Sequence, residues 1–160
     1  MPKIKLKLST DSINQALKEV KAYQKKVEKA ADDLVRRLTE QGVSLAQLNA
    51  SYMDIYDTGE LMRGIESQYK GKIGFVVSTA THSIFCEFGT GIVGAQNPHP
   101  EVAIAGWRYD VNEHGQLGWW YIGRDGKFHW TKGMPSRPYM YETAKMLRSM
   151  VVPLAKEVMR

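Results

Sequence analysis

The sequence predicts an α+β fold in which a small antiparallel sheet packs against a long N-terminal helix and a C-terminal helix. Three observations lead to this expectation: a long helical pattern near the start, two short apolar runs around Lys70-Gly71-Lys72, and a second helical pattern at the end. With 160 residues the chain is long enough to bury a core of its own. We therefore expect residues 1–160 to form a single domain.

The N-terminal third combines a strand pattern with a long helix pattern. Lysine alternates with isoleucine or leucine from Lys3 to Leu8, so residues 1–8 are expected to form a half-buried strand. Ser9-Thr10-Asp11-Ser12 offers capping side chains for a helix over residues 11–41. The apolar residues of this helix recur at alternating steps of four and three, as in a coiled-coil seam: Ile13, Leu17, Val20, Val27, Ala31, Leu34 and Leu38.

Gly42 is expected to end this helix, and Ser44–Ala50 to form a short second one. A helix as long as residues 11–41 either packs along the whole sheet or extends past it to meet another subunit.

The middle of the chain predicts a hairpin, a short helix and a long loop. Residues 63–88 contain two strand patterns around Lys70-Gly71-Lys72, followed by helical spacing of apolar residues up to Phe88. Residues 89–106 are rich in glycine, proline and small side chains, which favours a loop. Because loops of this length are usually functional or disordered, we expect this one to be mobile in the free protein.

The last third predicts an aromatic β-meander over residues 107–132 and a C-terminal helix over residues 138–159. Asp125-Gly126 is a typical two-residue hairpin turn. Pro153 is expected to kink or restart the C-terminal helix near its end. Four apolar residues share one face of that helix: Met140, Ala144, Leu147 and Val151.

Composition sets broad limits on the class of protein. The net charge of +5 permits contact with nucleic acid, although such a balance also commonly serves solubility alone. No apolar run approaches the roughly 20 residues of a membrane span, so we expect no membrane partner. The single cysteine, Cys86, excludes an internal disulfide framework and favours a reducing cytoplasm.

The glycines at 89, 91 and 94 match the letters of a dinucleotide-binding loop. That loop needs a helix directly after it, which Asn97-Pro98-His99-Pro100 disfavours, and a phosphate-binding loop would need a lysine that is absent here. We therefore expect no cofactor.

Cys86 invites a catalytic interpretation with His82, or with the more distant His99, His114 or His129. It lies among Phe85, Glu87 and Phe88, so a buried structural cysteine is favoured. His82 and Cys86 alone do not make a closed zinc site. We expect no metal ion and no catalytic residues, and hence no enzyme.

Two pairs of carboxylates are candidates for acid–base chemistry: Asp57 with Glu60, and Glu66 with Glu87. The first pair is more simply explained as favourable charge at the start of a helix. Glu87 stands among apolar residues and is expected to pair with an arginine, either in a structural salt bridge or between subunits. Arg63 and Arg137 are the candidates.

A dense aromatic cluster with interleaved basic residues follows residue 106. It is consistent with base stacking in a nucleic-acid-binding protein, with a sheet packed on a helix, or with a protein–protein contact. The candidate partner surface comprises Trp107, Arg108, Trp119, Trp120, Tyr121, Arg124 and Trp130.

Three stretches in order resemble one family. They are Asp57-Thr58-Gly59-Glu60-Leu61-Met62-Arg63-Gly64-Ile65, Glu87-Phe88-Gly89-Thr90-Gly91 and Gly133-Met134-Pro135-Ser136-Arg137-Pro138-Tyr139-Met140. The sequence resembles the tail-completion, or head–tail joining, proteins of long-tailed (siphovirus-type) double-stranded DNA phages and prophages. It departs from the family pattern at Gly64 and Tyr139 and in its elaborate aromatic insert.

The resemblance implies a structural virion protein located at the head–tail interface and assembled in the bacterial host cytoplasm. Such proteins form a ring, commonly a hexamer, with the tail tube protein on one side, a neck or head-completion protein on the other, and DNA in the lumen. A tail terminator or a head-completion adaptor of the same virion is the related alternative.

The resemblance assigns an assembly or structural role to the residues of the three stretches. They are Thr58, Gly59, Leu61, Glu87, Phe88, Gly89, Thr90, Gly91, Pro135, Arg137 and Pro138. We expect Gly89 and Gly91 to release the chain from the packed core into an assembly loop.

Overall fold

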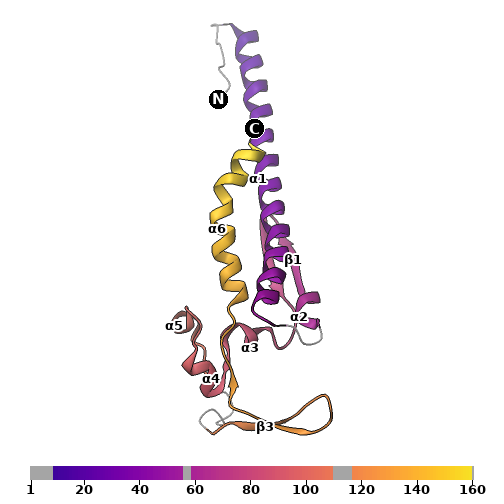
Figure 1. Ribbon diagram of the computed structural model, residues 1–160. Helices are drawn as coiled ribbons and strands as arrows, with labels where there is room; N and C mark the ends of the chain where they lie inside the picture. The colour runs from indigo at the N-terminus through magenta and orange to yellow at the C-terminus, as the bar shows by residue number, and fades with distance from the viewer. Residues whose placement is uncertain (1–8, 56–58, 110–116, 160) are drawn as a thin grey trace.

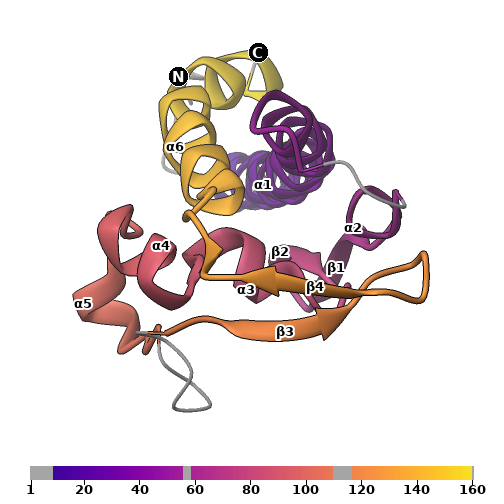
Figure 2. The same cartoon turned by 60° about the horizontal axis from the view of Figure 1, so that its bottom comes forward.

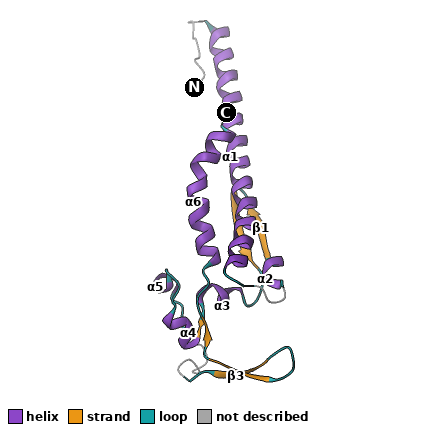
Figure 3. Ribbon diagram, in the orientation of Figure 1, coloured by secondary structure: helices purple, strands orange, loops and turns teal. Residues whose placement is uncertain are grey.

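The computed structural model describes residues 9–55, 59–109 and 117–159, and they form an elongated α+β fold. Helix α1 (Thr10–Tyr52) runs from the top of the molecule down to the level of α2, α6 (Tyr139–Val158) lies antiparallel beside its lower half, and β1 (Ile65–Lys70) lies on the opposite side of α1 from α6 (Figure 1). The remaining elements gather below the two long helices (Figure 3). They are α2 (Glu60–Arg63), α3 (Ser83–Phe88), α4 (Gly91–Gln96), α5 (Val102–Ala105), β3 (Trp119–Ile122), β4 (Phe128–Thr131) and β5 (Gly133–Met134).

The first hairpin forms a two-stranded antiparallel sheet against α1. Strand β1 pairs with β2 (Ile73–Ser78) so that Ile65 is opposite Ser78 and Lys70 is opposite Ile73. Gly71 makes the turn with a positive φ of 59°. Alternate residues of β2 point to opposite faces, and the face with Gly74 and Val76 meets α1.

Helix α1 does not end at Gly42, and Ser44–Ala50 is part of it rather than a second helix. Gly42 is buried in the helix because a Cβ there would lie 2.5 Å from Val76 Cγ2 and 3.0 Å from Leu147 Cδ1. The residues of α1 that pack closely here are small: Thr39, Gly42, Ala46 and Ala50. The glycine therefore permits a close approach between α1, β2 and α6 instead of terminating the helix.

Replacing Gly42 with alanine tests this packing. In an exposed helix the change would stabilise by about 1 kcal/mol, but here the added methyl group should destabilise by about 1–3 kcal/mol because β2 and α6 must move apart. Urea unfolding measures the difference. Ser44→Ala, on the exposed side of the same helix, is the control and should be neutral or slightly stabilising.

The apolar seam predicted for the N-terminal helix is only partly buried. The upper part of α1 projects beyond the end of α6 (Figure 1), and its seam residues are exposed there, with Leu17 at 53% and Val20 at 49%. The strand expected over residues 1–8 lies outside the described residues. The overhang is defined here as residues 10–27 of α1.

The buried core sits at the lower end of α1, where α2, α3 and the start of α6 converge. Its members are Ala46, Ala50, Ile55, Leu61, Ile65, Ala80, Cys86 and Tyr139. Tyr139 is 1% exposed, and this burial raises the pKa of its phenol to about 12.

Two expectations about the lower part of the molecule were wrong. Residues 89–106 are not one loop, because they contain α4 and α5. Residues 107–132 do not form a meander: within the described part they contain a single hairpin, β3–β4, which forms a separate sheet and lies below β1 (Figure 1). Its turn is longer than two residues, since Gly123 pairs with Lys127 and Gly126 takes a positive φ of 72°.

The C-terminal helix runs through Pro153 without restarting. Pro153 removes only one backbone hydrogen bond near the end of the helix, and Leu154 is buried. Asn49 Nδ2 donates to Thr143 Oγ1 at 2.9 Å, which joins α1 to α6 near their common lower end. None of the helices in the described ranges is both long and apolar enough to cross a bilayer.

Candidate functional site

The second and third motif stretches, far apart in sequence, meet in the structure. We call the pair of segments Glu87–Gly91 and Gly133–Tyr141 the motif junction. Their backbones pair in antiparallel fashion, with Thr90 opposite Met134 and Gly91 opposite Gly133. The junction lies at the start of α6, directly below the core (Figure 1).

Glu87 is the central side chain of the motif junction. It is 8% exposed, its Oε2 accepts from the Met140 amide at 2.9 Å, and its Oε1 accepts from the Tyr141 amide at 2.9 Å. These amides belong to the first turn of α6, where backbone N–H groups have no partner within the helix. Pro138, the N-cap residue, has no side-chain acceptor. A carboxylate from α3 therefore caps α6, and its negative charge interacts favourably with the positive N-terminal end of the helix dipole.

The expected arginine partner of Glu87 was wrong. The third group on the carboxylate is His99, whose Nε2 lies 3.2 Å from Oε1, instead of Arg63 or Arg137. His99 Nδ1 accepts from the Glu101 amide at 3.0 Å, so Nε2 carries the proton that it donates to Glu87. The imidazole is buried, at 4% exposure, and packs 4.4 Å from the Phe88 ring centroid.

His99 therefore links the turn between α4 and α5 to α3 and α6. From the sequence, His99 was considered only as a distant partner for Cys86, and its contact with Glu87 was not predicted. Its position between two prolines, in Asn97-Pro98-His99-Pro100, was the one available signal that its backbone is held in place.

Further hydrogen bonds join the two segments of the motif junction. Ser136 Oγ donates to the Glu87 carbonyl at 2.6 Å, the Arg137 amide donates to the Cys86 carbonyl at 2.9 Å, and the Met134 amide donates to Thr90 Oγ1 at 3.2 Å. These bonds lie next to the Glu87 cap. The segments thus support each other through main-chain and side-chain contacts.

Gly89 and Gly91 hold the chain in this junction and do not release it into a loop. Both have positive φ, 78° and 61°. A Cβ on Gly89 would lie 2.6 Å from the Ser136 amide nitrogen, and one on Gly91 would meet the Lys132 carbonyl oxygen. Only glycine combines this backbone conformation with so close an approach of another chain segment.

Trp107 packs against the motif junction and is not part of the aromatic hairpin. Its ring stacks on Phe88 at 5.3 Å, and its Nε1 donates to the Gly89 carbonyl at 3.0 Å. Arg108, the next residue, is exposed. The candidate partner surface therefore separates into two places in the structure.

The structure also places most of the other residues of the three motif stretches. Thr58 lies outside the described residues, whereas Gly59 has a φ of 72° at the start of α2 and Leu61 is 3% exposed in the core. The Pro135 carbonyl carbon lies against Gly89, at 2.9 Å from the position of a Cβ. Arg137 lines a cavity of about 490 Å³ together with Cys86.

The catalytic interpretation of Cys86 finds little support in its surroundings. Burial raises the pKa of the Cys86 thiol, an effect that the nearby Arg137 charge only partly opposes. His82 lines the same cavity, but no hydrogen bond joins these two described side chains. Within the described ranges, no three His, Cys, Asp or Glu residues gather closely enough to hold a metal ion.

The β3–β4 hairpin has one face made only of apolar side chains. Cross-strand pairing puts Trp120 opposite Trp130 and Ile122 opposite Phe128, so these four share one face. Ile122 is 66% and Phe128 69% exposed. We call these four residues the hairpin face.

The opposite side of the hairpin carries Tyr121 and His129, while Trp119 is half-buried beside Gly91. Arg124 lies in the exposed turn. Of the residues expected to form a partner surface, the hairpin thus presents Trp120 and Trp130 together. Comparisons of the chain with models of protein families, with curated proteins and with solved structures found no match.

Proposed function

We propose that this protein is a structural component of the head–tail interface of a long-tailed double-stranded DNA phage, where it completes the tail and joins it to the neck as a hexameric ring. The observation that carries the proposal is the motif junction. Two stretches that suggest the family from the sequence depend on each other through Glu87, Gly89 and Ser136. They serve to fix the start of α6, which is a structural role.

The exposed surfaces support an assembly role. The overhang and the hairpin face both present apolar side chains at ends of an elongated molecule (Figure 1). Contiguous exposed apolar surface commonly marks a contact with another protein. A ring requires two different patches on each copy, one of which contacts the other on its neighbour.

A protein partner suits the hairpin face better than nucleic acid. Base stacking on a protein normally combines aromatic side chains with a basic groove. The hairpin face has no charged member, and Arg124 and Lys127 lie in or beside the turn instead. The tail tube protein or the neck protein is thus the proposed occupant, and DNA in the lumen would be contacted without sequence preference. A tail terminator or head-completion adaptor would use the same surfaces.

Deletion of the gene from the phage or prophage that carries it tests this function. Electron microscopy of the lysate should show filled heads and tails that are not joined, and the wild-type gene in trans should restore complete particles. Intact, infectious virions without the protein would contradict the proposal.

The hairpin face should matter for docking and not for folding. We expect the double substitution Ile122→Ser and Phe128→Ser to weaken co-sedimentation with tail tubes of the same phage by at least about tenfold, because exposed apolar side chains at the centre of an interface dominate its affinity. The urea midpoint should stay unchanged because both residues are largely exposed. Tyr121→Ser, on the other side of the hairpin, is the control, and equal losses for both variants would contradict a role for this face.

A further inference from the structure

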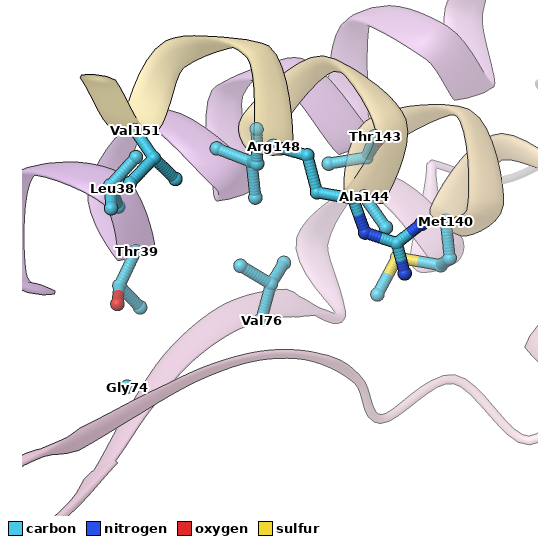
Figure 4. A pocket seen from close by; sticks show the side chains of 10 residues that line it. Leu38, Thr39, Gly74, Val76, Met140, Thr143, Ala144, Arg148 and Val151 are labelled. Carbon is cyan, nitrogen blue, oxygen red and sulfur yellow. The ribbon is translucent and has the colours of Figure 1, made fainter. Parts of the chain in front are cut away.

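An apolar groove lies between α1, β2 and α6 (Figure 4). Its volume is about 350 Å³. Leu38 and Thr39 line it from α1, and Gly74 and Val76 from β2. Helix α6 contributes the apolar face predicted from the sequence, with Thr143 and Arg148 beside it: Met140, Ala144, Leu147 and Val151.

The groove is open because the sheet stops short of α6. Figure 2 shows β2 next to β1, with both strands below α1 and α6 in that view. In the described part of the chain β2 pairs with β1 alone, so its other edge offers unpaired amides and carbonyls. Ala144 and Val151 on α6 remain exposed above this space.

An edge of this kind fits an added β-strand. A strand paired with β2 would point every second side chain into the groove, against Val76 and Leu147, and the others toward the opposite face of the sheet. On that opposite face β2 carries the partly exposed Ile73 and Phe75, and β1 carries Glu66 across from Val77. The matching segment is therefore apolar at alternate positions and basic or long-stemmed at the positions between.

We propose that the groove binds residues 3–8 of a second copy of this chain as a β-strand. In Lys3-Ile4-Lys5-Leu6-Lys7-Leu8 the three apolar side chains enter the groove. The three lysines then lie on the opposite face, where their methylene stems cover Ile73 and Phe75 and a charged head reaches Glu66. This proposal deepens the proposed function by naming the contact that joins neighbouring copies, and it rests on that function for the closure of the ring.

The strand must come from another copy. Leu38, which lines the groove, is 28 positions after Thr10, the first residue of α1, and this places it about 42 Å along the helix. Lys3 is seven residues before Thr10, so the chain allows even this residue a separation from Thr10 of at most about 25 Å. Residues 3–8 therefore cannot lie along the groove of their own chain.

The overhang extends the same contact. It follows the strand directly and exposes Ile13, Leu17 and Val20. One copy would donate its strand and overhang, and the next would offer its groove, so that the two surfaces differ and the contact can repeat around a ring.

Binding of a synthetic peptide of residues 1–9 tests the groove directly. The receptor is the full chain with Ile4, Leu6 and Leu8 changed to serine, which leaves its groove unoccupied. A fluorescent wild-type peptide should bind at least about tenfold more tightly than the same peptide with those three serines. Ala144→Arg in the receptor should weaken binding by a similar factor, whereas Lys145→Arg, on the next position of α6, should not. Equal binding of the two peptides, or no effect of Ala144→Arg, would overturn the proposal.

Cross-linking between copies tests whether the added strand lies next to β2. Full-length Lys5→Cys protein mixed with Phe75→Cys protein should give a dimer with a short bifunctional thiol reagent, and Lys5→Cys mixed with Gln68→Cys, on β1, should give far less. The native Cys86 is buried, and the unmodified protein checks that it does not react. Equal yields with Phe75→Cys and Gln68→Cys would refute pairing at the β2 edge.

The two proposals fail in different ways. If the triple-serine variant still forms rings, the strand–groove contact is wrong and the head–tail role stands. If peptide and cross-links behave as expected in a protein that never forms rings, the contact stands and the head–tail role is wrong.

Discussion

Glu87→Ala should lower the free energy of unfolding by about 3 kcal/mol or more. The substitution leaves the amides of Met140 and Tyr141 without their carboxylate partner and removes the acceptor of the buried His99. Removing one partner from a buried hydrogen-bonded group has a large effect because the remaining groups stay desolvated. Urea unfolding monitored by circular dichroism measures the loss, and native mass measures the accompanying loss of ring formation.

Glu142→Ala is the matched control for Glu87→Ala. Glu142 lies in the same first turns of α6, but it is partly exposed and pairs with Lys145 at 3.0 Å on the surface. We expect it to change stability by no more than about 0.5–1 kcal/mol. If Glu87→Ala were as mild as Glu142→Ala, the carboxylate would not be the cap that fixes α6.

Gly89→Ala should strongly destabilise the protein, because Gly89 combines a conformation reserved for glycine with close contacts to the other segment of the motif junction. The residue has φ 78° and ψ 171°, a region that is occupied almost only by glycine. The new Cβ would lie 2.6 Å from the Ser136 nitrogen and 2.8 Å from the Met134 oxygen, and both are backbone atoms of the paired segment. We expect a loss of about 3 kcal/mol or more in urea unfolding.

Gly106→Ala separates the effect of the backbone conformation from the effect of the close contact with another segment. Gly106 also has a positive φ, 63°, but nothing lies within 4 Å of the position of its Cβ. It should show only the conformational effect of about 1–2 kcal/mol. Similar losses at Gly89 and Gly106 would mean that the two motif stretches do not need their close approach.

Regular local patterns predicted much of the fold. The β1–β2 hairpin follows from apolar runs around Lys70-Gly71-Lys72, and α6 follows from the spacing of Met140, Ala144 and Leu147. In both cases the period of the side chains and the turn or cap residues act over a few positions, which is the range that a sequence pattern reports.

Features set by distant contacts could not be predicted in this way. Gly42 has the usual signature of a helix end, yet it allows α1 to pack closely on Val76 and Leu147. Helices α4 and α5 are too short for a periodic signal, and the residues on both sides of α4, Gly89 and His99, are held in place at the motif junction.

At the candidate site, the partners of Glu87 likewise could not be predicted, because they are distant in the sequence. The sequence identified the residue because a carboxylate among apolar neighbours needs a partner. It suggested arginine because that is the common solution, whereas the partners are two backbone amides more than fifty positions away and a histidine twelve positions away. Backbone donors carry no sequence signature, so only the fold reveals them.

Native mass across a concentration series, with and without the tail tube protein of the same phage, tests the central claim most directly. The account predicts a closed ring of about six copies, formed by the protein alone or on addition of tail tube protein. A protein that stays monomeric at every concentration, and is indifferent to tail tube protein, would contradict it.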